Sequence, residues 1–509
     1  MLVATSVGSH PLAPAVDSLV AMSLWLRGAE PSFLLCDGAL PACEACAYTE
    51  FSDPAEFVAQ GPGRRLCRPC FARGERYYRP LPLPLHRYRD YVSEGEIAGL
   101  LGEANTMSLE ECRTFEHEGL GLGEQVHAAM LRFFGKADLG SEPEALVLAT
   151  ARRYAAGALV AARVAERVLE HVDPEAVVCH HGIYVPQGVL GEVARRAGVR
   201  VVNWQPAYRD TTVIFSHGDT YHRTMISEPT EQWDFGLTEA EEQELMRYLA
   251  ARRQGKGDWT WVTPEAALRI ESQKHERLVG ELGLDTSRPI AGLLTNVLWD
   301  AQLYYEGIAF PDMLDWLWCT LDFFRARPDR QLLVRIHPHE VKQGNRQPVG
   351  PEIERRYGEL PPNITVVPHD HPYNTYSLME LCDVVLTYGT KTGVELVPVG
   401  IPVVVCGDAW IREKGLTHDI SSREEYLELL ERVHEFNRLD PETIARGRSY
   451  AYHYFFRRMI PLASLEPGSR IPPSMRITTI EDLAPGRDPG LDVICDGIIS
   501  GEPFVLDGR

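Results

Sequence analysis

Residues 383–395 read Asp383-Val384-Val385-Leu386-Thr387-Tyr388-Gly389-Thr390-Lys391-Thr392-Gly393-Val394-Glu395, which is an apolar run, a turn of glycine and threonine, and the start of a helix. In open parallel sheets, ligands bind outside the carboxyl ends of strands, where helix N-termini offer unpaired N–H groups to a phosphate. We therefore predict that the turn cradles a phosphate through Thr390, Lys391, Thr392 and Gly393, with Glu395 on a ribose. The alternative is a helix capped by threonine, with glycine for close packing.

Alternating elements surround this stretch on both sides. Apolar runs that predict strands cover residues 289–295, 331–336, 364–368, 384–387 and 402–406, and helical patterns between them cover 312–325, 374–382 and 392–399. Strands are predicted in the first half over residues 2–7, 32–36, 176–179 and 199–204. Strands that alternate with helices indicate parallel sheets covered on both faces. The expected fold class is α/β with two Rossmann-like domains.

Bulk properties narrow the functional classes. The chain has 509 residues and a formal net charge of −21, which argues against a generic binder of nucleic acid or anionic membranes. In the sequence, no apolar run approaches the ~20 residues that cross a bilayer, and the first residues lack the pattern of a signal peptide. We expect a cytoplasmic protein without a transmembrane segment, or one held peripherally at the inner membrane face by an assembly complex.

A second polar group follows the strand predicted over residues 331–336. Arg335, His337, Pro338 and His339 stand at its carboxyl end, on the sheet edge predicted for the phosphate turn. Pro338 stops the strand. The sequence therefore predicts Arg335 and Pro338 in donor binding and His337 as a catalytic residue that acts on a donor phosphate.

Four other polar residues follow predicted strands. His180 and His181 follow the strand at 176–179, and an imidazole there can act as a base because it titrates near the working pH. A polar turn is the alternative. Asn296 and Asp300 follow the first strand of the second half and are predicted to bind a ligand there.

Four segments in this order, residues 335–338, 389–395, 400–407 and 414–417, resemble the capsule polysaccharide biosynthesis family, which includes Kdo transferases. The resemblance implies the GT-B fold, in which two Rossmann-like domains face a cleft, and a metal-independent glycosyltransferase. In that fold the cleft holds the acceptor, so the resemblance implies that His180 or His181 is the base that deprotonates the acceptor hydroxyl. It also implies that Asn296 and Asp300 bind sugar hydroxyls. The His-Pro pair also resembles that of bacterial sialyltransferases, where it lies by the CMP phosphate, and Thr390 and Thr392 would stand opposite it. The chain departs from the family at Lys391, whose charge suits a diphosphate donor.

The first seventy residues contain a cysteine cluster. Cys43-x-x-Cys46 and Cys67-x-x-Cys70 have the spacing of a structural zinc site, with an iron–sulfur cluster or free thiols as alternatives. We predict a zinc module over residues 37–84, inserted in an N-terminal acceptor domain of residues 1–36 and 85–265. A nucleotide-sugar domain is predicted over 266–435, and a tail that packs back on the N-terminal domain over 436–509.

These patterns favour transfer of a sugar from a CMP- or UDP-type donor to a surface or capsular polysaccharide, or to a related or lipid-linked glycan. No Asp-x-Asp pattern for a catalytic metal stands at a predicted strand end, so zinc is the one cofactor expected, and its role would be structural. The alternatives are a nucleotide-sugar 2-epimerase or polyol-phosphate transferase of the same fold, and a non-catalytic sugar-nucleotide-binding scaffold.

Overall fold

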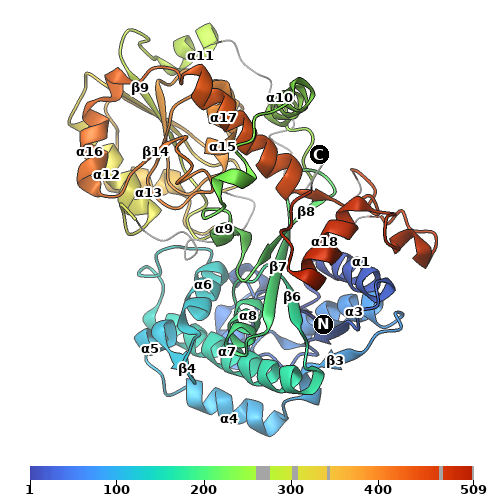
Figure 1. Ribbon diagram of the computed structural model, residues 1–509. Coiled ribbons are helices and arrows are strands. Elements are labelled where there is room, and N and C mark those ends of the chain that lie inside the picture. The colour runs from blue at the N-terminus through green and yellow to red at the C-terminus, as the bar shows by residue number, and fades with distance from the viewer. Residues whose placement is uncertain (260–274, 301–307, 341–343, 469–473, 507–509) are drawn as a thin grey trace. The chain divides into compact units, whose positions relative to one another are not determined.

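The computed structural model describes residues 1–259, 275–300, 308–340, 344–468 and 474–506. The chain divides into two compact units, of which unit 1 comprises Met1–Thr224 and Arg458–Arg509 and unit 2 comprises Met225–Arg457 (Figure 1). The domain boundary predicted between residues 265 and 266 lies outside the described residues. The predicted domain ranges therefore stay predictions.

In the described part of unit 1, seven strands form one sheet in the order β15-β8-β7-β6-β1-β2-β3. The five strands from β7 to β3 are parallel, whereas β8 and β15 run antiparallel to their neighbours. Their bounds are β1 Leu2–Ser6, β2 Ser32–Leu35, β3 Leu85–Arg87, β6 Ala176–His180, β7 Arg200–Pro206, β8 Thr212–His217 and β15 Ile460–Pro461. A small hairpin of β4 Glu116–His117 and β5 Leu120–Gly121 stands apart from the sheet.

In the described part of unit 2, six strands form a wholly parallel sheet in the order β11-β10-β9-β12-β13-β14. Their bounds are β9 Ile290–Leu294, β10 Gln331–Arg335, β11 Ile364–Val367, β12 Val384–Thr387, β13 Val403–Val405 and β14 His418–Asp419. Every residue of β9, β10, β12 and β13 is buried. The near-continuous apolar runs thus form inner strands covered on both faces.

Both sheets have the same winding. When the first six main-sheet strands of each unit are counted in chain order, each sheet reads 3-2-1-4-5-6, the order of dinucleotide-binding folds. The winding reverses between β1 and β6 in unit 1 and between β9 and β12 in unit 2. Ligands of such sheets bind at the reversal, outside the carboxyl ends of the strands. The α/β, Rossmann-like prediction is confirmed for both units.

Helices cover the sheets. Figure 1 shows α1, α3 and α18 grouped on one side of the unit 1 sheet, and α7 with α8 on the other. The helices of unit 1 are α1 Ala13–Leu26, α2 Pro54–Gln60, α3 Gly63–Tyr78, α4 Glu94–Ala104, α5 Leu109–Thr114, α6 Gly123–Phe134, α7 Glu144–Val172, α8 Gln187–Arg196, α9 Tyr221–Thr224 and α18 Pro489–Ser500. Those of unit 2 are α10 Glu239–Arg253, α11 His275–Leu282, α12 Met313–Arg325, α13 Val349–Tyr357, α14 Thr375–Met379, α15 Thr392–Leu396, α16 Arg423–Glu431 and α17 Pro441–Tyr452.

Helix α7 is long and apolar enough to cross a membrane by length and composition alone. Its most apolar stretch is 67% buried inside the protein, where α7 packs against α4, α5, α6 and α8. Buried helices of globular cores pass the same composition test. Among the described residues, α7 is the one helix that does so.

Helix α3 forms where the sequence predicted irregular chain. It connects β2 to β3 and packs on α1 and β2. Tyr78 at its end stacks on Phe33 of β2, with ring centroids 4.2 Å apart. The Tyr78 hydroxyl donates to the buried Asp17 of α1 at 2.9 Å, and Trp204 Nε1 donates to the same carboxyl at 3.0 Å. The residues predicted as an inserted module therefore include the crossover helix of the unit 1 sheet.

Candidate functional site

Three strand ends of unit 2 are joined at the reversal point. The Thr295 hydroxyl, after β9, accepts from the backbone N of His337 at 3.0 Å. The Thr295 amide donates to the carbonyl of Arg335 at 3.2 Å. The Asn296 side-chain Nδ2 donates to the carbonyl of Gly389, after β12, at 2.8 Å. The predicted residues of these loops are thus brought together at one edge of the sheet.

The His337 ring is held in one orientation. Its Nδ1 accepts from the backbone N of His339 at 3.2 Å. Burial, with the nearby His339, Lys391 and Arg335 adding to its effect, lowers the pKa of His337 to about 3. The imidazole is therefore neutral at neutral pH, and because Nδ1 is an acceptor, the proton is assigned to Nε2. Such a ring is a hydrogen-bond donor rather than a cation.

The turn after β12 places two hydroxyls side by side. Thr390 Oγ1 and Thr392 Oγ1 are 3.0 Å apart, and the amide of Thr392 donates to Thr390 Oγ1 at 3.3 Å. The close-packing alternative applies at Gly393, where a Cβ would lie 3.0 Å from Cγ2 of Ile411. Helix α15 is only five residues long before a 3-10 turn continues it, so its dipole adds little to anion binding. The hydroxyls are the main donors of the turn.

Glu395 lies in a buried ion cluster. Its carboxylate accepts from Arg252 Nε at 3.0 Å, from Lys391 Nζ at 2.7 Å and from the Tyr376 hydroxyl. Burial alone would raise the pKa of Glu395, but the Arg252 and Lys391 charges lower it to about 2. Burial and the Arg252 charge also lower the pKa of Lys391. Both carboxylate oxygens already have partners, and the predicted ribose contact stays a prediction.

Arg335 is turned toward the strand on its other side. Its guanidinium donates to the carbonyl of Pro368, to the carbonyl of His371 at 3.3 Å and to Thr375 Oγ1 at 3.3 Å. It is 1% exposed, and burial lowers its pKa to about 10. Arg335 thus braces the loop after β11. Its predicted role in donor binding is untested, as is that of the half-buried Pro338.

Two polar atoms after β9 are buried without a hydrogen-bond partner among the described residues. They are Oδ1 of Asn296 and Nε1 of Trp299. Such atoms cost free energy unless a ligand or water satisfies them. Asp300, which was predicted to bind sugar hydroxyls, is exposed in the same loop. An acceptor and a donor therefore stand unused in the loop after β9.

Unit 1 gathers histidines at its own reversal point. The His180 ring, at the end of β6, lies 4.6 Å from the ring of His10, which follows β1, and 5.6 Å from the ring of His181. Burial lowers the pKa of His10 to about 4, with Arg132 and Arg73 adding to the effect. Burial and nearby histidines or Arg132 also hold the pKa values of His180 and His181 well below the ordinary range. All three rings are neutral at neutral pH.

The surroundings of these histidines are charged and polar. Arg132 of α6 lies over the Tyr184 ring at 5.3 Å and donates to the carbonyl of Glu44 at 3.2 Å. Gln187 Nε2 donates to the carbonyl of Thr5 at 3.0 Å and to the Glu44 carboxyl at 3.3 Å. Burial raises the pKa of Glu44 to about 7, against the opposing effect of Arg132. A carboxyl that titrates near neutrality can exchange a proton at working pH.

Backbone strain marks the same edge. Ser6 at the end of β1 has a φ of 65°, and His181 and Tyr184 in the loop after β6 have φ of 71° and 67°. These are left-handed conformations that non-glycine residues rarely adopt. Strained residues cluster at functional sites. Both loops at the unit 1 reversal point show this strain.

The four predicted zinc ligands do not all face one point. Cys43, Cys67 and Cys70 line a small cavity near the end of β2, together with Cys36, whereas Cys46 is outside its lining. Across the described ranges, no group of three or more His, Cys, Asp or Glu side chains is arranged to hold a metal ion. The predicted set of Cys43, Cys46, Cys67 and Cys70 therefore stays a prediction.

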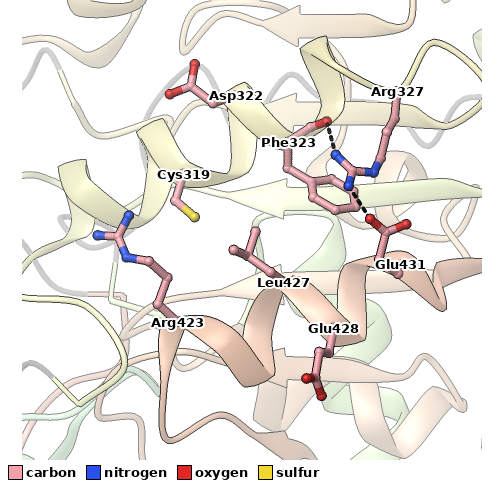
Figure 2. Close-up of a pocket in the computed structure, with 8 residues that line it drawn as sticks. All are labelled: Cys319, Asp322, Phe323, Arg327, Arg423, Leu427, Glu428 and Glu431. Carbon is pink, nitrogen blue, oxygen red and sulfur yellow. Dashed lines mark hydrogen bonds and ion pairs between the residues drawn. The ribbon is translucent and has the colours of Figure 1, made fainter.

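A larger hollow of about 440 Å³ lies elsewhere in unit 2, between α12 and α16. Figure 2 shows Arg327 pointing across it to Glu431 and donating to the carbonyl of Phe323 at 3.4 Å. The residues that line this hollow come from α12, α16 and the residue positions next to them, and none of them stands at a strand end. We place no ligand there.

Several site residues have no sequence signal at their own position. Arg252 and Tyr376 surround Glu395, and Arg132 and Glu44 lie by the histidines, but each belongs to a different stretch of chain. His10 is the exception. It follows the first predicted strand, so the rule that selected His180 could have found it.

Comparisons with known proteins give structures of low similarity. The chain is similar to KpsC from Thermosulfurimonas dismutans, a β-Kdo 2,4 transferase, with 15% identity over 61% of this chain and 87% of that one, and a TM-score of 0.37. It is similar to UDP-GlcNAc 2-epimerase from Neisseria meningitidis bound to UDP-GlcNAc, with 13% identity over 71% and 94% and a TM-score of 0.25. It is similar to the spinosyn rhamnosyltransferase SpnG, with 11% identity over 89% of this chain and 95% of that one, and a TM-score of 0.27. No protein-family model and no curated protein matches the chain. At these values the similarity assigns no activity.

Proposed function

We propose that the protein transfers a sugar from a CMP- or UDP-type donor that binds at the unit 2 reversal point. The observation that carries this proposal is the group of donors on one sheet edge, namely Nε2 of His337 and the hydroxyls of Thr390 and Thr392. Anionic phosphate is the ligand that such a set recognises best. The proposed acceptor is a surface or capsular polysaccharide, or a related or lipid-linked glycan.

The proposed chemistry needs charge stabilisation at the donor. The acceptor hydroxyl attacks the anomeric carbon, the bond from that carbon to the phosphate oxygen breaks, and the nucleotide leaves with the bonding electrons. Negative charge grows on the phosphate, where the Nε2–H of His337 and the Lys391 ammonium would stabilise it. Catalytic metal is not part of the proposal.

The proton of the acceptor hydroxyl must go to a base. We propose His180 or His181 for this role, as the sequence suggested, because both rings are neutral and so carry an unprotonated nitrogen. Nδ1 of each ring is buried without a partner among the described residues. The neighbouring Glu44 and His10 are additional candidates to receive that proton.

A ligand screen tests the proposal. The melting temperature is measured with CMP, UDP, GDP and dTDP, because a bound nucleotide stabilises the folded state by RT ln(1 + [L]/Kd). The best nucleotide then selects sugar donors for turnover assays with and without glycan acceptors. Transfer to an acceptor supports the proposal. A 2-epimer formed without acceptor identifies an epimerase, and binding without turnover identifies a scaffold.

Two further parts of this proposal rest on the sequence. The proposed place of action is the cytoplasm, or the inner membrane face as a peripheral protein. A structural zinc ion in the cysteine-rich segment is also proposed, and it would act on stability rather than on transfer.

A further inference from the structure

A buried carboxyl of unit 1 accepts hydrogen bonds from two aromatic side chains. Asp17, on α1, is 0% exposed. Its Oδ1 accepts from Nε1 of Trp204 at 3.0 Å, and its Oδ2 accepts from the hydroxyl of Tyr78 at 2.9 Å. Both donors are themselves buried, Trp204 on β7 and Tyr78 at the end of α3. A carboxyl is costly to bury without such partners, and the proposed function gives this one no part.

The indole of Trp204 links this carboxyl to the reversal point of unit 1. Trp204 is the cross-strand partner of His180 in the parallel pair of β6 and β7, so both side chains lie on the same face of the sheet. The two rings meet edge to face, with centroids 4.9 Å apart and an interplanar angle of 62°. The indole also stacks on Phe215 of β8, with centroids 6.0 Å apart. One side chain therefore contacts both the Asp17 carboxyl and the His180 imidazole.

The His180 ring depends on such packing for its orientation. Its Nδ1 is buried without a hydrogen-bond partner among the described residues. The backbone is fixed separately, because the His180 amide donates to Thr5 Oγ1 at 3.1 Å and the His181 amide donates to the Trp204 carbonyl at 2.8 Å. The ring itself contacts the rings of Trp204, His10 and His181. Trp204 is 1% exposed whereas the two histidines are half-buried, so the indole is the contact that comes from the core.

We propose that Asp17 is a positioning residue for His180 and that it acts through the indole of Trp204. The inference rests on the proposed function, in which His180 or His181 accepts the proton of the acceptor hydroxyl, and it narrows that choice to His180. Asp17 holds the indole by its Nε1, and the indole holds the imidazole at the end of β6. Asp17 itself touches no substrate. Because a misplacement of about 1 Å can cost about 100-fold in rate, a loose His180 ring should slow transfer without weakening donor binding.

Tyr78 provides an internal comparison for this role. It donates to the same carboxyl as Trp204 does, but it reaches the carboxyl from α3. Its ring stacks on Phe33 of β2, and β1 separates β2 from β6 in the sheet. If Asp17 served only the stability of unit 1, its two donors would be equivalent in every measurement. A positioning role makes them differ in the rate of transfer.

Two matched deletions separate positioning from stability. Tyr78→Phe and Trp204→Phe each remove one donor from the buried carboxyl, so both should lower the melting temperature. Only Trp204→Phe should lower kcat for transfer to acceptor, by about 10- to 100-fold, while the Kd of the nucleotide stays unchanged. Equal kcat values per folded enzyme in the two variants would overturn the proposal.

Substitution of Asp17 itself supplies a conservative rescue. Asp17→Leu has a similar shape but accepts no hydrogen bond, so the indole loses its anchor and kcat should fall by about 10- to 100-fold. Asp17→Asn keeps an oxygen that can accept from Trp204 and an amide that can donate to the Tyr78 oxygen, so it should restore most of the rate. A folded Asp17→Leu enzyme with the parent kcat, or an Asp17→Asn enzyme as slow as Asp17→Leu, contradicts the proposal. If Asp17→Leu does not fold, the comparison of Trp204→Phe with Tyr78→Phe decides.

A further measurement does not depend on sugar transfer. NMR spectra are recorded of protein isotopically labelled at the Cε1 of histidine, and the His180 signal is the one that His180→Asn lacks. This signal should keep its position in Tyr78→Phe and Asp17→Asn, and it should shift or split in Asp17→Leu because the ring takes a second orientation. An unchanged signal in folded Asp17→Leu would overturn the proposal. If the signal follows Asp17 in a protein that transfers no sugar, the positioning holds and the proposed function fails.

Discussion

The side-chain amide of Asn296 donates to the carbonyl of Gly389 at 2.8 Å, across the point where the unit 2 sheet reverses its winding. This bond joins the loop after β9 to the turn that carries Thr390 and Lys391. Both loops lie where the nucleotide is proposed to bind, so their mutual position is part of the binding geometry.

The first prediction concerns this bond. Asn296→Asp replaces the donor by a carboxylate that faces a carbonyl and repels a phosphate, so nucleotide affinity should fall by about 1–2 kcal/mol, or roughly tenfold. Calorimetric titration of the nucleotide checks it, with Asn437→Asp as a matched exposed control. Equal affinities for the two variants would show that Asn296 does not shape the site.

The second prediction concerns His337. Because the neutral ring is assigned as an Nε2–H donor, His337→Ala should lower kcat by about 10²–10³ with little change in melting temperature. His337→Gln offers an amide N–H near the same place and should recover part of the rate. His339→Ala is the control, because this variant keeps the backbone amide that donates to Nδ1 of His337. A folded His337→Ala enzyme with the parent rate would exclude the role.

The third prediction concerns the ion cluster around Glu395. Glu395→Gln leaves Arg252 and Lys391 buried without their counter-ion, and the free energy of unfolding should fall by about 3–5 kcal/mol. Urea denaturation measures this loss. The folded pKa of Glu395 lies below its unfolded value, so its contribution is present above about pH 4.5 and is lost as pH falls toward 2.

Ribose binding predicts a different result for the same residue. A stable Glu395→Gln protein with weakened nucleotide affinity would mean that Glu395 serves the ligand, as the sequence suggested. A destabilised protein that still binds nucleotide when folded would mean that Glu395 serves the fold.

The fourth prediction concerns Asp17, whose pKa burial raises from 3.8 to about 7. The unfolded carboxyl releases its proton near pH 4 and the folded one near pH 7. The free energy of unfolding should therefore fall by about 4 kcal/mol as the pH rises from about 4 to about 7. Asp17→Asn resembles the protonated form and should remove this slope. Urea denaturation at about pH 5 and pH 8 checks it, with Asp496→Asn as an exposed control. A slope unchanged in Asp17→Asn would contradict the assignment.

The fifth prediction concerns the unit 1 histidines. His180→Asn should lower the rate of transfer to acceptor by about 10²-fold, while nucleotide affinity stays unchanged. Because the pKa of His180 lies well below 6.5, the rate should not fall near that pH through protonation of this ring. The control is His127→Asn, a half-buried histidine on α6. Equal rates for the two variants would remove His180 from the mechanism.

The sequence predicted the strands well because most are short, near-continuous apolar runs. The order of the strands in the sheets was not predicted, and neither were β3, β8, β14 and β15, which lie outside the predicted apolar runs. Helix α3 was missed because Gly63 and Pro69 are poor helix formers and its many arginines hide an apolar face. The side chains at strand ends were found by a rule of topology. Their partners were not, because Arg252 lies 143 residues from Glu395 and only the fold brings them together.

Unit 1 is built from two separate segments of the chain, and strand β15 belongs to the second one. Ile460 pairs with Val213 of β8, and Phe504 stacks on His217 with ring centroids 4.3 Å apart. Until Arg458–Arg509 leaves the ribosome, β8 is an open edge strand whose unpaired amides and carbonyls can capture another chain. Unit 1 can therefore complete its fold only after the last part of the chain has been synthesised. A protein truncated after unit 2 should aggregate rather than fold as a shorter soluble protein.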